Sequence, residues 1–227
     1  MVIVDTRYNV LFTKILNMRH LILGQEGKLK EEFMPFQVLS IPDEAPMEIT
    51  RMITTTKYGH STLQMSMVGS TFCTTYDDKY NTDWEKCYNY LDEKYKKIYD
   101  VIVELQPERI LTQGFVLNVF KENPNPISFL RNKIQILQTE QHLSTLICKF
   151  ATKTAAGFTV NVQLSNAQDT VANAEGLLIQ IETNDILSTK ENNSYVSTKE
   201  TAGQLLTNLS EIYSKLDSFI DSGVLTI

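Results

Sequence analysis

Apolar and polar residues alternate along parts of the first half of the chain, and this pattern predicts β-strands. From Leu63 to Val68 most alternate residues are apolar, which is the period of a strand buried on one face. The segment Met47–Ile53 precedes it across a turn at Lys57–His60, where Gly59 supplies the positive φ that a tight turn favours. These segments predict a hairpin, and Thr71–Tyr76 is predicted as a third strand.

A different period begins after this third strand. Apolar and aromatic residues recur at spacings of three and four, which predicts one face of an amphipathic helix over residues 82–105. The residues on that face are Trp84, Cys87, Tyr88, Leu91, Tyr95, Ile98 and Ile102. Thr82 and Glu85 have the spacing of a capping box, so the helix is expected to begin there, and Pro107 is expected to stop it.

The second half repeats this order of elements. Ile110–Phe120 is predicted as a strand, in which Gly114 marks a bulge or a close approach of another backbone. His142–Thr152 and Phe158–Leu164 are predicted to form a hairpin, with Leu177–Thr183 as the next strand. The pattern therefore predicts three more strands in an arrangement like that of the first half.

The remaining segments of the second half are less regular until the last helix. Ile127–Leu137 has no clear period, and the polar stretch Asn184–Val196 is predicted to be a mobile loop. Ser197–Glu200 has the spacing of a second capping box. It precedes a helical stripe formed by Leu205, Leu209, Ile212, Leu216 and Phe219.

Both halves thus share the order strand, irregular segment, hairpin, strand and capped long helix. Tyr95–Ile98 aligns with Tyr213–Leu216, which favours an internal duplication. The alternative is that this order arose without duplication, because it is common in α+β proteins. We predict an α+β fold class: an antiparallel sheet built from two strand–hairpin–strand–helix repeats, with long amphipathic helices packed on one face. Residues 1–106 and 107–227 are the predicted halves, packed as one duplicated domain.

Composition and charge exclude some classes of function. The 227 residues are 42% hydrophobic and carry 21 basic and 27 acidic side chains, a formal net charge of −6 that is divided equally between the halves. A nucleic-acid-binding surface favours clustered Lys and Arg and a high pI, whereas the pI of this chain is near 5.2. Nucleic acid is therefore not an expected partner. The one dense basic group is Lys94, Lys96 and Lys97, which is interpreted as the solvated face of a helix.

The sequence also bears on location. No apolar run is long enough to span a bilayer, and the first residues lack the pattern of a signal peptide. Cys73, Cys87 and Cys148 are odd in number and widely spaced, which favours buried, reduced thiols over a disulfide framework. A cytoplasmic protein without membrane association is expected.

The chain lacks the common catalytic and metal-binding motifs. The chain contains no phosphate loop, nucleophile elbow, dinucleotide fingerprint or zinc motif. His20, His60 and His142 lie in separate segments, and His60 and His142 are interpreted as surface residues near hairpins and not as metal ligands. Asp77 and Asp78 have the chemistry to bind a divalent cation, but the pair also suits a turn between strand and helix, which is the favoured interpretation. No cofactor or metal site is predicted.

Tyrosines are dense around the first predicted helix. Most are expected to pack against the sheet, but Tyr90 and Tyr99 fall at the margin of the apolar face. Tyrosine is favoured at protein–protein contacts because it combines apolar area with a polar tip. Tyr90 and Tyr99 are therefore the candidate partner-binding residues.

Four features carry a resemblance to a sporadically distributed bacterial family of uncharacterised proteins. They are the run Ile41-Pro-Asp-Glu, the hairpin that follows it, Tyr80-Asn-Thr-Asp-Trp84 before a long helix, and the strand Gly176-Leu-Leu-Ile-Gln-Ile before a second long helix. That resemblance implies genome-island cargo and an accessory role in a defence or stress system. The layout of strands and long helices is also similar to the SecB-like export-chaperone fold, a likeness of architecture alone.

The sequence favours a non-catalytic protein-interaction module. We expect it to hold a protein partner, either a second copy or the product of a neighbouring gene, through a sheet face, a strand edge or the tyrosines at the helix margin. The alternative is a metal-dependent enzyme whose site is assembled from scattered polar residues around Asp77 and Asp78.

Overall fold

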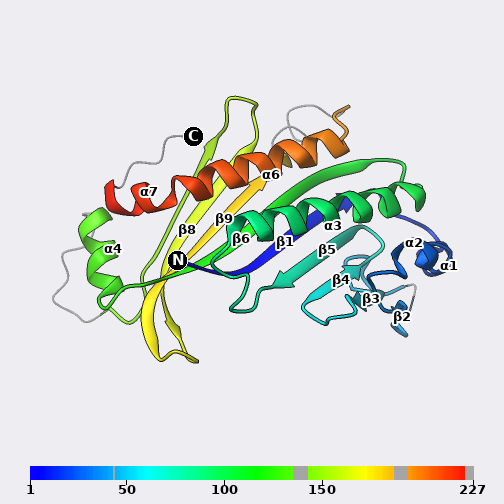
Figure 1. Ribbon diagram of the computed structural model, residues 1–227. Helices are drawn as coiled ribbons and strands as arrows, with labels where there is room; N and C mark the ends of the chain where they lie inside the picture. Colours follow the sequence, from blue (N-terminus) through cyan, green and yellow to red (C-terminus); the bar gives the residue numbers. More distant parts are fainter. Residues whose placement is uncertain (43, 135–142, 187–193, 223–227) are drawn as a thin grey trace.

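The nine strands of the computed structural model form one antiparallel sheet in the order β2-β3-β4-β5-β1-β6-β9-β8-β7 (Figure 1). The structure describes residues 1–42, 44–134, 143–186 and 194–222. In chain order the elements are β1 (Val2–Phe12), α1 (Met18–Leu23), α2 (Glu26–Leu29), β2 (Gln37–Val38), β3 (Met52–Thr55), β4 (Ser61–Met65), β5 (Gly69–Thr75), α3 (Trp84–Glu104), β6 (Ile110–Glu122), α4 (Pro126–Ile134), β7 (Ile147–Lys153), β8 (Thr159–Asp169), β9 (Ala174–Asn184), α6 (Lys199–Ser214) and α7 (Leu216–Ser222).

The fold class predicted from the sequence is wrong. The chain is mostly a single nine-stranded sheet, with 36% strand and 30% helix, and its six described helices are short; it is not a pair of repeats with long amphipathic helices packed on a sheet. One reason is that the stripe from Leu205 to Phe219 does not form one helix, because α6 ends at Ser214 and α7 begins at Leu216. A second is that segments without a clear period form α1, α2 and α4.

The centre of the sheet is the antiparallel pair β1 and β6, which are far apart in the sequence. Arg7 lies opposite Val116 and Asn9 lies opposite Gly114 in this pair. On one side of it stand β5, β4, β3 and the two-residue β2, and on the other stand β9, β8 and β7. Apart from β2, the strand order of one half mirrors that of the other. The division into 1–106 and 107–227 stays a prediction.

One face of the sheet carries the hydrophobic core. Phe115, Leu117 and Val119 of β6 are completely buried on this face, as are Ile179 and Ile181 of β9. Figure 1 shows α3, α6 and α7 lying across the same side of the sheet. The alternation of side chains in a strand sends the intervening residues to the opposite face.

That opposite face carries polar side chains at its centre. The Asn118 side-chain amide donates to the Asp5 carboxylate at 2.9 Å, and Gln180 donates to the Asn118 oxygen at 3.2 Å. These three residues sit side by side on β1, β6 and β9. This row of hydrogen-bonded side chains therefore crosses the boundary between the two halves of the sheet.

The ends of the two main helices differ slightly from the expected positions. The N-cap of α3 is Asp83, one residue after Thr82, and its carboxylate accepts from the Lys86 backbone N–H. The N-cap of α6 is Thr198, whose capping box is completed by Thr201. A hydroxyl or a carboxylate satisfies the same unpaired backbone donors, so adjacent Ser, Thr and Asp residues compete for the N-cap position.

Several strands also differ in extent from the sequence prediction. The segment Met47–Ile53 is a strand only from Met52, and His142–Thr152 only from Ile147. Most of α4, which begins one residue earlier at Pro126, lies in the segment Ile127–Leu137, whose last three residues are outside the described ones. His142 and most of the predicted loop Asn184–Val196 also lie outside them.

A buried polar network joins the centre of the sheet to the start of α6. The Tyr8 hydroxyl donates to the Gln113 side chain, whose amide in turn donates to the Ser197 hydroxyl at 2.8 Å. Ser197 donates to the Asp185 carboxylate, which is completely buried. This network fixes the segment after β9 against β6.

Alkaline pH is expected to unfold the protein through its buried tyrosines. Burial raises the pKa of Tyr95 to about 12 and raises the pKa values of Tyr8 and Tyr76 well above their ordinary value near 10. The unfolded chain releases these protons from about pH 10, whereas the folded chain retains them. Stability is therefore complete below pH 10 and falls as the pH rises toward 12 and beyond.

This expectation is tested by following tyrosinate absorbance and circular dichroism in one alkaline titration. Part of the absorbance change should coincide with the loss of the circular dichroism signal. If all ten tyrosines ionise near pH 10 while the circular dichroism signal is unchanged, the expectation is wrong.

Candidate functional site

A groove of about 710 Å³ lies where the turn before β4, the end of β5 and the first turns of α3 meet. Its size falls within the range of roughly 300–1,000 Å³ that is typical of ligand sites. The lining residues are Tyr58, His60, Thr75, Tyr76, Asp77, Lys79, Tyr80, Lys86, Cys87 and Tyr90. The wall is therefore rich in tyrosine, with charged side chains among the aromatic rings.

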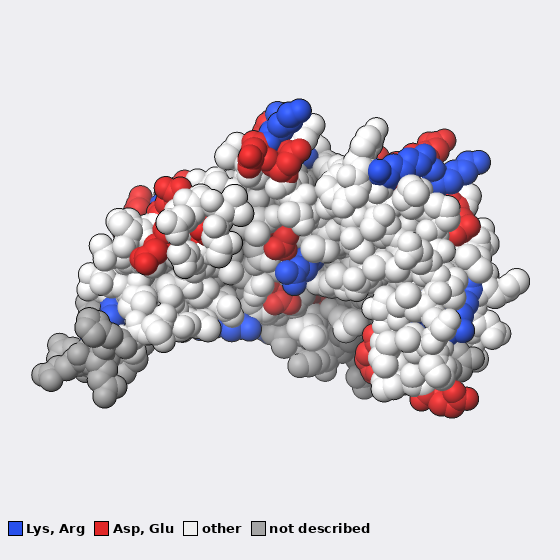
Figure 2. All heavy atoms as spheres, turned by 90° about the horizontal axis from the view of Figure 1, so that it is seen from below, with Lys and Arg blue, Asp and Glu red and all other residues white. Residues whose placement is uncertain are grey.

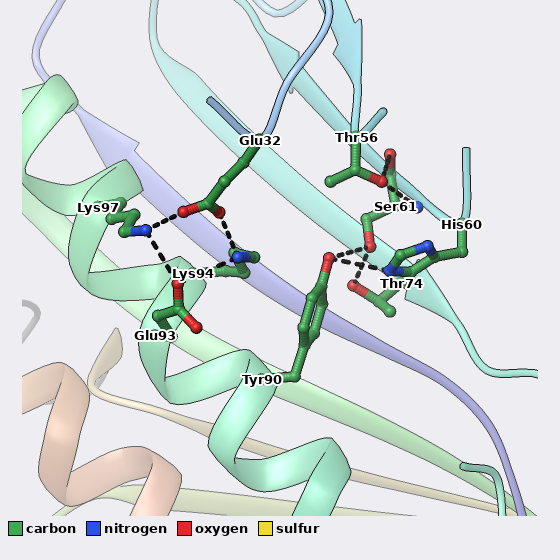
Figure 3. A network of polar contacts seen from close by, with 9 residues as sticks. All are labelled: Glu32, Thr56, His60, Ser61, Thr74, Tyr90, Glu93, Lys94 and Lys97. Carbon is green, nitrogen blue, oxygen red and sulfur yellow. Dashed lines mark hydrogen bonds and ion pairs between the residues drawn. The ribbon is translucent and has the colours of Figure 1, made fainter. Parts of the chain in front are cut away.

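The Tyr90 hydroxyl is the centre of a polar network on one side of the groove (Figure 3). It lies 2.8 Å from the Ser61 hydroxyl and 3.1 Å from His60 Nε2. Ser61 in turn lies 2.9 Å from the Thr74 hydroxyl. Because Ser61 and Thr74 belong to neighbouring strands, the network joins α3 to both β4 and β5 and holds the Tyr90 ring in place.

The surroundings of Tyr90 keep its phenol neutral. Burial raises the pKa of Tyr90, while the hydrogen bond with Ser61 and the Lys94 ammonium oppose that rise. Lys94 Nζ stands 5.0 Å from the centre of the Tyr90 ring, a cation–π contact. The phenol therefore serves as a neutral hydrogen-bonding group and as an aromatic surface.

The lysines beside Tyr90 do not form a basic patch. Lys94 is buried and pairs with Glu32, and Lys97 pairs with both Glu32 and Glu93 at the side of the network in Figure 3. Lys96 pairs with Asp92 at 2.6 Å. The interpretation of the three lysines as a solvated helix face is wrong for Lys94, because Glu32 ties it to the segment after α2.

On the face shown in Figure 2, charged residues of both signs lie in small groups separated by wide uncharged areas.

Two tyrosines at the groove expose their rings to solvent. Tyr58 is 91% exposed and Tyr80 is 47% exposed, which is unusual for large aromatic side chains. The Tyr58 ring stacks at 6.5 Å on His60, and His60 is the exposed turn residue that the sequence predicts. The aromatic area thus continues from the half-buried Tyr90 ring to the exposed rings at the rim.

The charges at the rim are partly compensated. Lys86 pairs with Asp83 at 2.7 Å and stands 6.0 Å from the centre of the Tyr80 ring. Within the described residues Lys79 forms no ion pair, so its ammonium is available to a bound group. A ligand in the groove would meet aromatic rings beside the Lys79 ammonium and the Asp77 carboxylate, which also forms no ion pair in the described part of the chain.

Asp77 and Asp78 form the turn between β5 and α3. The Asp77 carboxylate accepts from the Lys79 backbone N–H at 3.1 Å, and Asp78 accepts from the Asn81 side chain at 3.3 Å. The turn interpretation is confirmed by these contacts. Across the described ranges of the chain, no three His, Cys, Asp or Glu side chains gather into a group suited to a metal ion.

The groove offers hydrogen-bonding groups and aromatic rings for stacking. Its potential nucleophiles, the Ser61 hydroxyl and the Cys87 thiol, are not activated. Ser61 is only 1% exposed and is held by Tyr90 and Thr74. Burial raises the pKa of the Cys87 thiol to about 12, so it stays protonated at neutral pH. Cys87 is buried as expected, whereas Cys73 and Cys148 are only half-buried, and all three are free thiols.

The two tyrosines singled out by the sequence do not share a site. A helix turns by about 100° per residue, so nine positions separate Tyr90 and Tyr99 by about two and a half turns and place them on opposite sides of α3. Tyr90 lines the groove, whereas Tyr99 lies near Lys199 and Glu200 at the start of α6, where burial raises its pKa. The role of either residue in partner binding stays a prediction.

Sequence reasoning missed most of the groove. Tyr58 and Ser61 flank the hairpin turn, but a turn tyrosine has no periodic neighbours to mark it. Only three-dimensional packing brings that turn to the first turns of α3. The available signal was Gly59, whose φ of 76° confirms the tight turn that presents Tyr58 and His60 together.

No protein-family model matches the chain, and no curated protein sequence is similar enough to register as a match. None of the helices in the described residues is long and apolar enough to cross a membrane.

Proposed function

We propose that this chain is a cytoplasmic, non-catalytic protein-interaction module that binds a partner through the groove beside Tyr90. One observation carries the proposal: two solvent-exposed tyrosine rings, Tyr58 and Tyr80, flank a groove whose wall is fixed by the Tyr90 network. Exposed aromatic rings around a concave surface are typical of binding sites. The three free thiols support the cytoplasmic location.

The rigid wall of the groove favours binding because its side chains lose little conformational entropy when a partner binds. Tyr90 is already held by Ser61 and His60, and its ring already contacts Lys94. Side chains that are ordered before binding lose less conformational entropy in the complex. Only the exposed rings of Tyr58 and Tyr80 need to become ordered.

The groove also defines the chemistry of the partner. Its aromatic wall fits one large apolar or aromatic side chain, since such rings pack best edge-to-face or offset. The ammonium of Lys79, which lacks an ion pair in the described residues, fits a carboxylate beside that anchor. The partner is therefore a protein segment with an aromatic or large aliphatic residue next to Asp or Glu.

This function is tested by selecting peptides from a random display library on the immobilised chain. Selected peptides are expected to share an apolar anchor beside an acidic residue. They should bind the Y58A/Y80A double variant about tenfold more weakly, since tyrosine anchors at interfaces are commonly worth about 1.4 kcal/mol or more. Fluorescence anisotropy with the synthetic peptides gives the dissociation constants.

The matched control is Val171→Ala, which truncates an apolar side chain of similar exposure in the β8–β9 turn. It should leave peptide binding unchanged, and Lys79→Glu should weaken the acidic peptides selectively. Selection of no peptide above background, or equal binding to wild type and to Y58A/Y80A, rejects the proposal.

A further inference from the structure

The two edges of the sheet differ in the backbone that they leave open. The edge strand β2 has only two residues, Gln37 and Val38, whereas the edge strand β7 has seven. β7 pairs with β8 on its inner side along its whole length. From Ile147 to Thr152 its outer side has no strand beside it in the described residues. An outer row of unpaired N–H and C=O groups is a template for one more strand.

The side chains of β7 give that edge two distinct faces. Phe150 points to the same side as the core residue Val162, its partner in the register, and its ring lies 5.6 Å from Phe219 of α7. Phe150 is nevertheless 37% exposed, so the core is incomplete at this edge. Lys149 and Ala151 alternate with Phe150 and therefore point to the opposite face.

The charge of β7 is opposite to that of the whole chain. The strand contains two lysines and no acidic residue, although the chain carries −6. Lys149 is exposed and forms no ion pair in the described residues. A second copy of β7 would bring a second Lys149 onto the same face of the paired strands, and like charges close together across strands are destabilising.

We propose that β7 accepts, as a tenth strand, an extended segment of a protein partner in which acidic and apolar residues alternate. The backbone of that segment pairs with the outer side of β7. Its apolar residues cover Phe150, and its carboxylates face Lys149. This surface is separate from the tyrosine-lined groove, and either site can exist without the other.

The test uses a short peptide of alternating Glu and Val, with a peptide of alternating Lys and Val as the matched probe. Fluorescence anisotropy is expected to show binding of the acidic peptide at least about tenfold tighter than that of the basic one. Hydrogen exchange should show slower exchange of β7 amides in the presence of the acidic peptide. The same experiment on Y58A/Y80A should give the same result, which separates this site from the groove.

Lys149→Glu is the decisive variant, because it changes only an exposed side chain. It should weaken the acidic peptide about tenfold and strengthen the basic one. The control Lys14→Glu makes the same charge change at another exposed position and should alter neither. The proposal is overturned if the two peptides bind equally, or if the acidic peptide does not slow hydrogen exchange of the β7 amides. It is also overturned if the β7 amides become protected as the protein concentration rises and the chain forms a dimer.

Discussion

Replacing Asp185 with alanine is expected to lower the free energy of unfolding by about 4 kcal/mol. Asp185 is completely buried just after β9, and its carboxylate accepts four hydrogen bonds. One oxygen accepts from the Thr112 hydroxyl at 2.5 Å and from the Gln113 backbone N–H at 2.7 Å. The other accepts from the Tyr195 hydroxyl at 2.9 Å and from the Ser197 hydroxyl.

The large effect follows from what the alanine leaves behind. Each buried donor that loses its acceptor costs about 1–3 kcal/mol, although hydroxyls can turn to recover part of that loss. Asp185→Asn keeps one carbonyl oxygen for Thr112 and Gln113, and its amide can donate to Tyr195 and Ser197. The asparagine variant is therefore expected to lose less than half as much stability as the alanine variant.

Urea denaturation followed by circular dichroism measures both variants. The alanine variant should also melt about 8–16 °C below wild type, since 1 kcal/mol shifts the melting temperature of a chain this size by about 2–4 °C. Glu108→Ala removes an exposed carboxylate and should change nothing measurable. An alanine variant as stable as the Glu108 variant would contradict the burial of the network.

The sequence was informative where a strand or helix depends on its own residues. Leu63 and Met65 alternate with polar neighbours because one face of β4 is buried, and the structure places both in the core. The period of Leu91, Ile98 and Ile102 likewise marks the buried side of α3. Such patterns report which side of an element is buried but contain no information about its neighbour.

The architecture was missed because it depends on contacts between distant residues. The pairing of Tyr8 with Phe115 joins β1 to β6 across the chain, and no local pattern reveals it. The division between α6 and α7 at Lys215 was missed because the apolar spacing continues through it from Ile212 to Leu216. The same apolar spacing is compatible with one continuous helix or with two helices that meet at Lys215.

The site shows the same limit. Tyr90 was singled out from its position at the helix margin, but Tyr58 and Tyr80 stand in turns where periodicity carries no signal. Asp185 was placed in a polar loop, because a buried carboxylate is indistinguishable in sequence from an exposed one. Its four donors come from two separate segments of the chain, β6 and residues 195–197.

Gly114→Val is expected to destabilise the protein by about 3 kcal/mol, because a side chain at this position meets backbone on the neighbouring strand. A Cβ atom at Gly114 would lie 2.9 Å from the Thr183 carbonyl oxygen and 3.0 Å from the Asn184 Cβ. Both contacts belong to β9, which pairs with β6 from Gly114 to Glu122 and cannot shift without disturbing that pairing. The structure thus confirms the close approach that the sequence suggested for this glycine.

Gly114→Ala adds one carbon atom and should already cost about 2 kcal/mol, while the valine variant should cost more. The matched control is Gly27→Ala in α2, where an added Cβ has nothing within 4 Å and the helical conformation favours alanine. The control should be neutral or slightly stabilising in urea denaturation. A Gly114→Ala variant as stable as the Gly27→Ala control would contradict this expectation. It would mean that β6 and β9 can move apart despite their continuous pairing, and that Gly114 does not set the distance between these two strands.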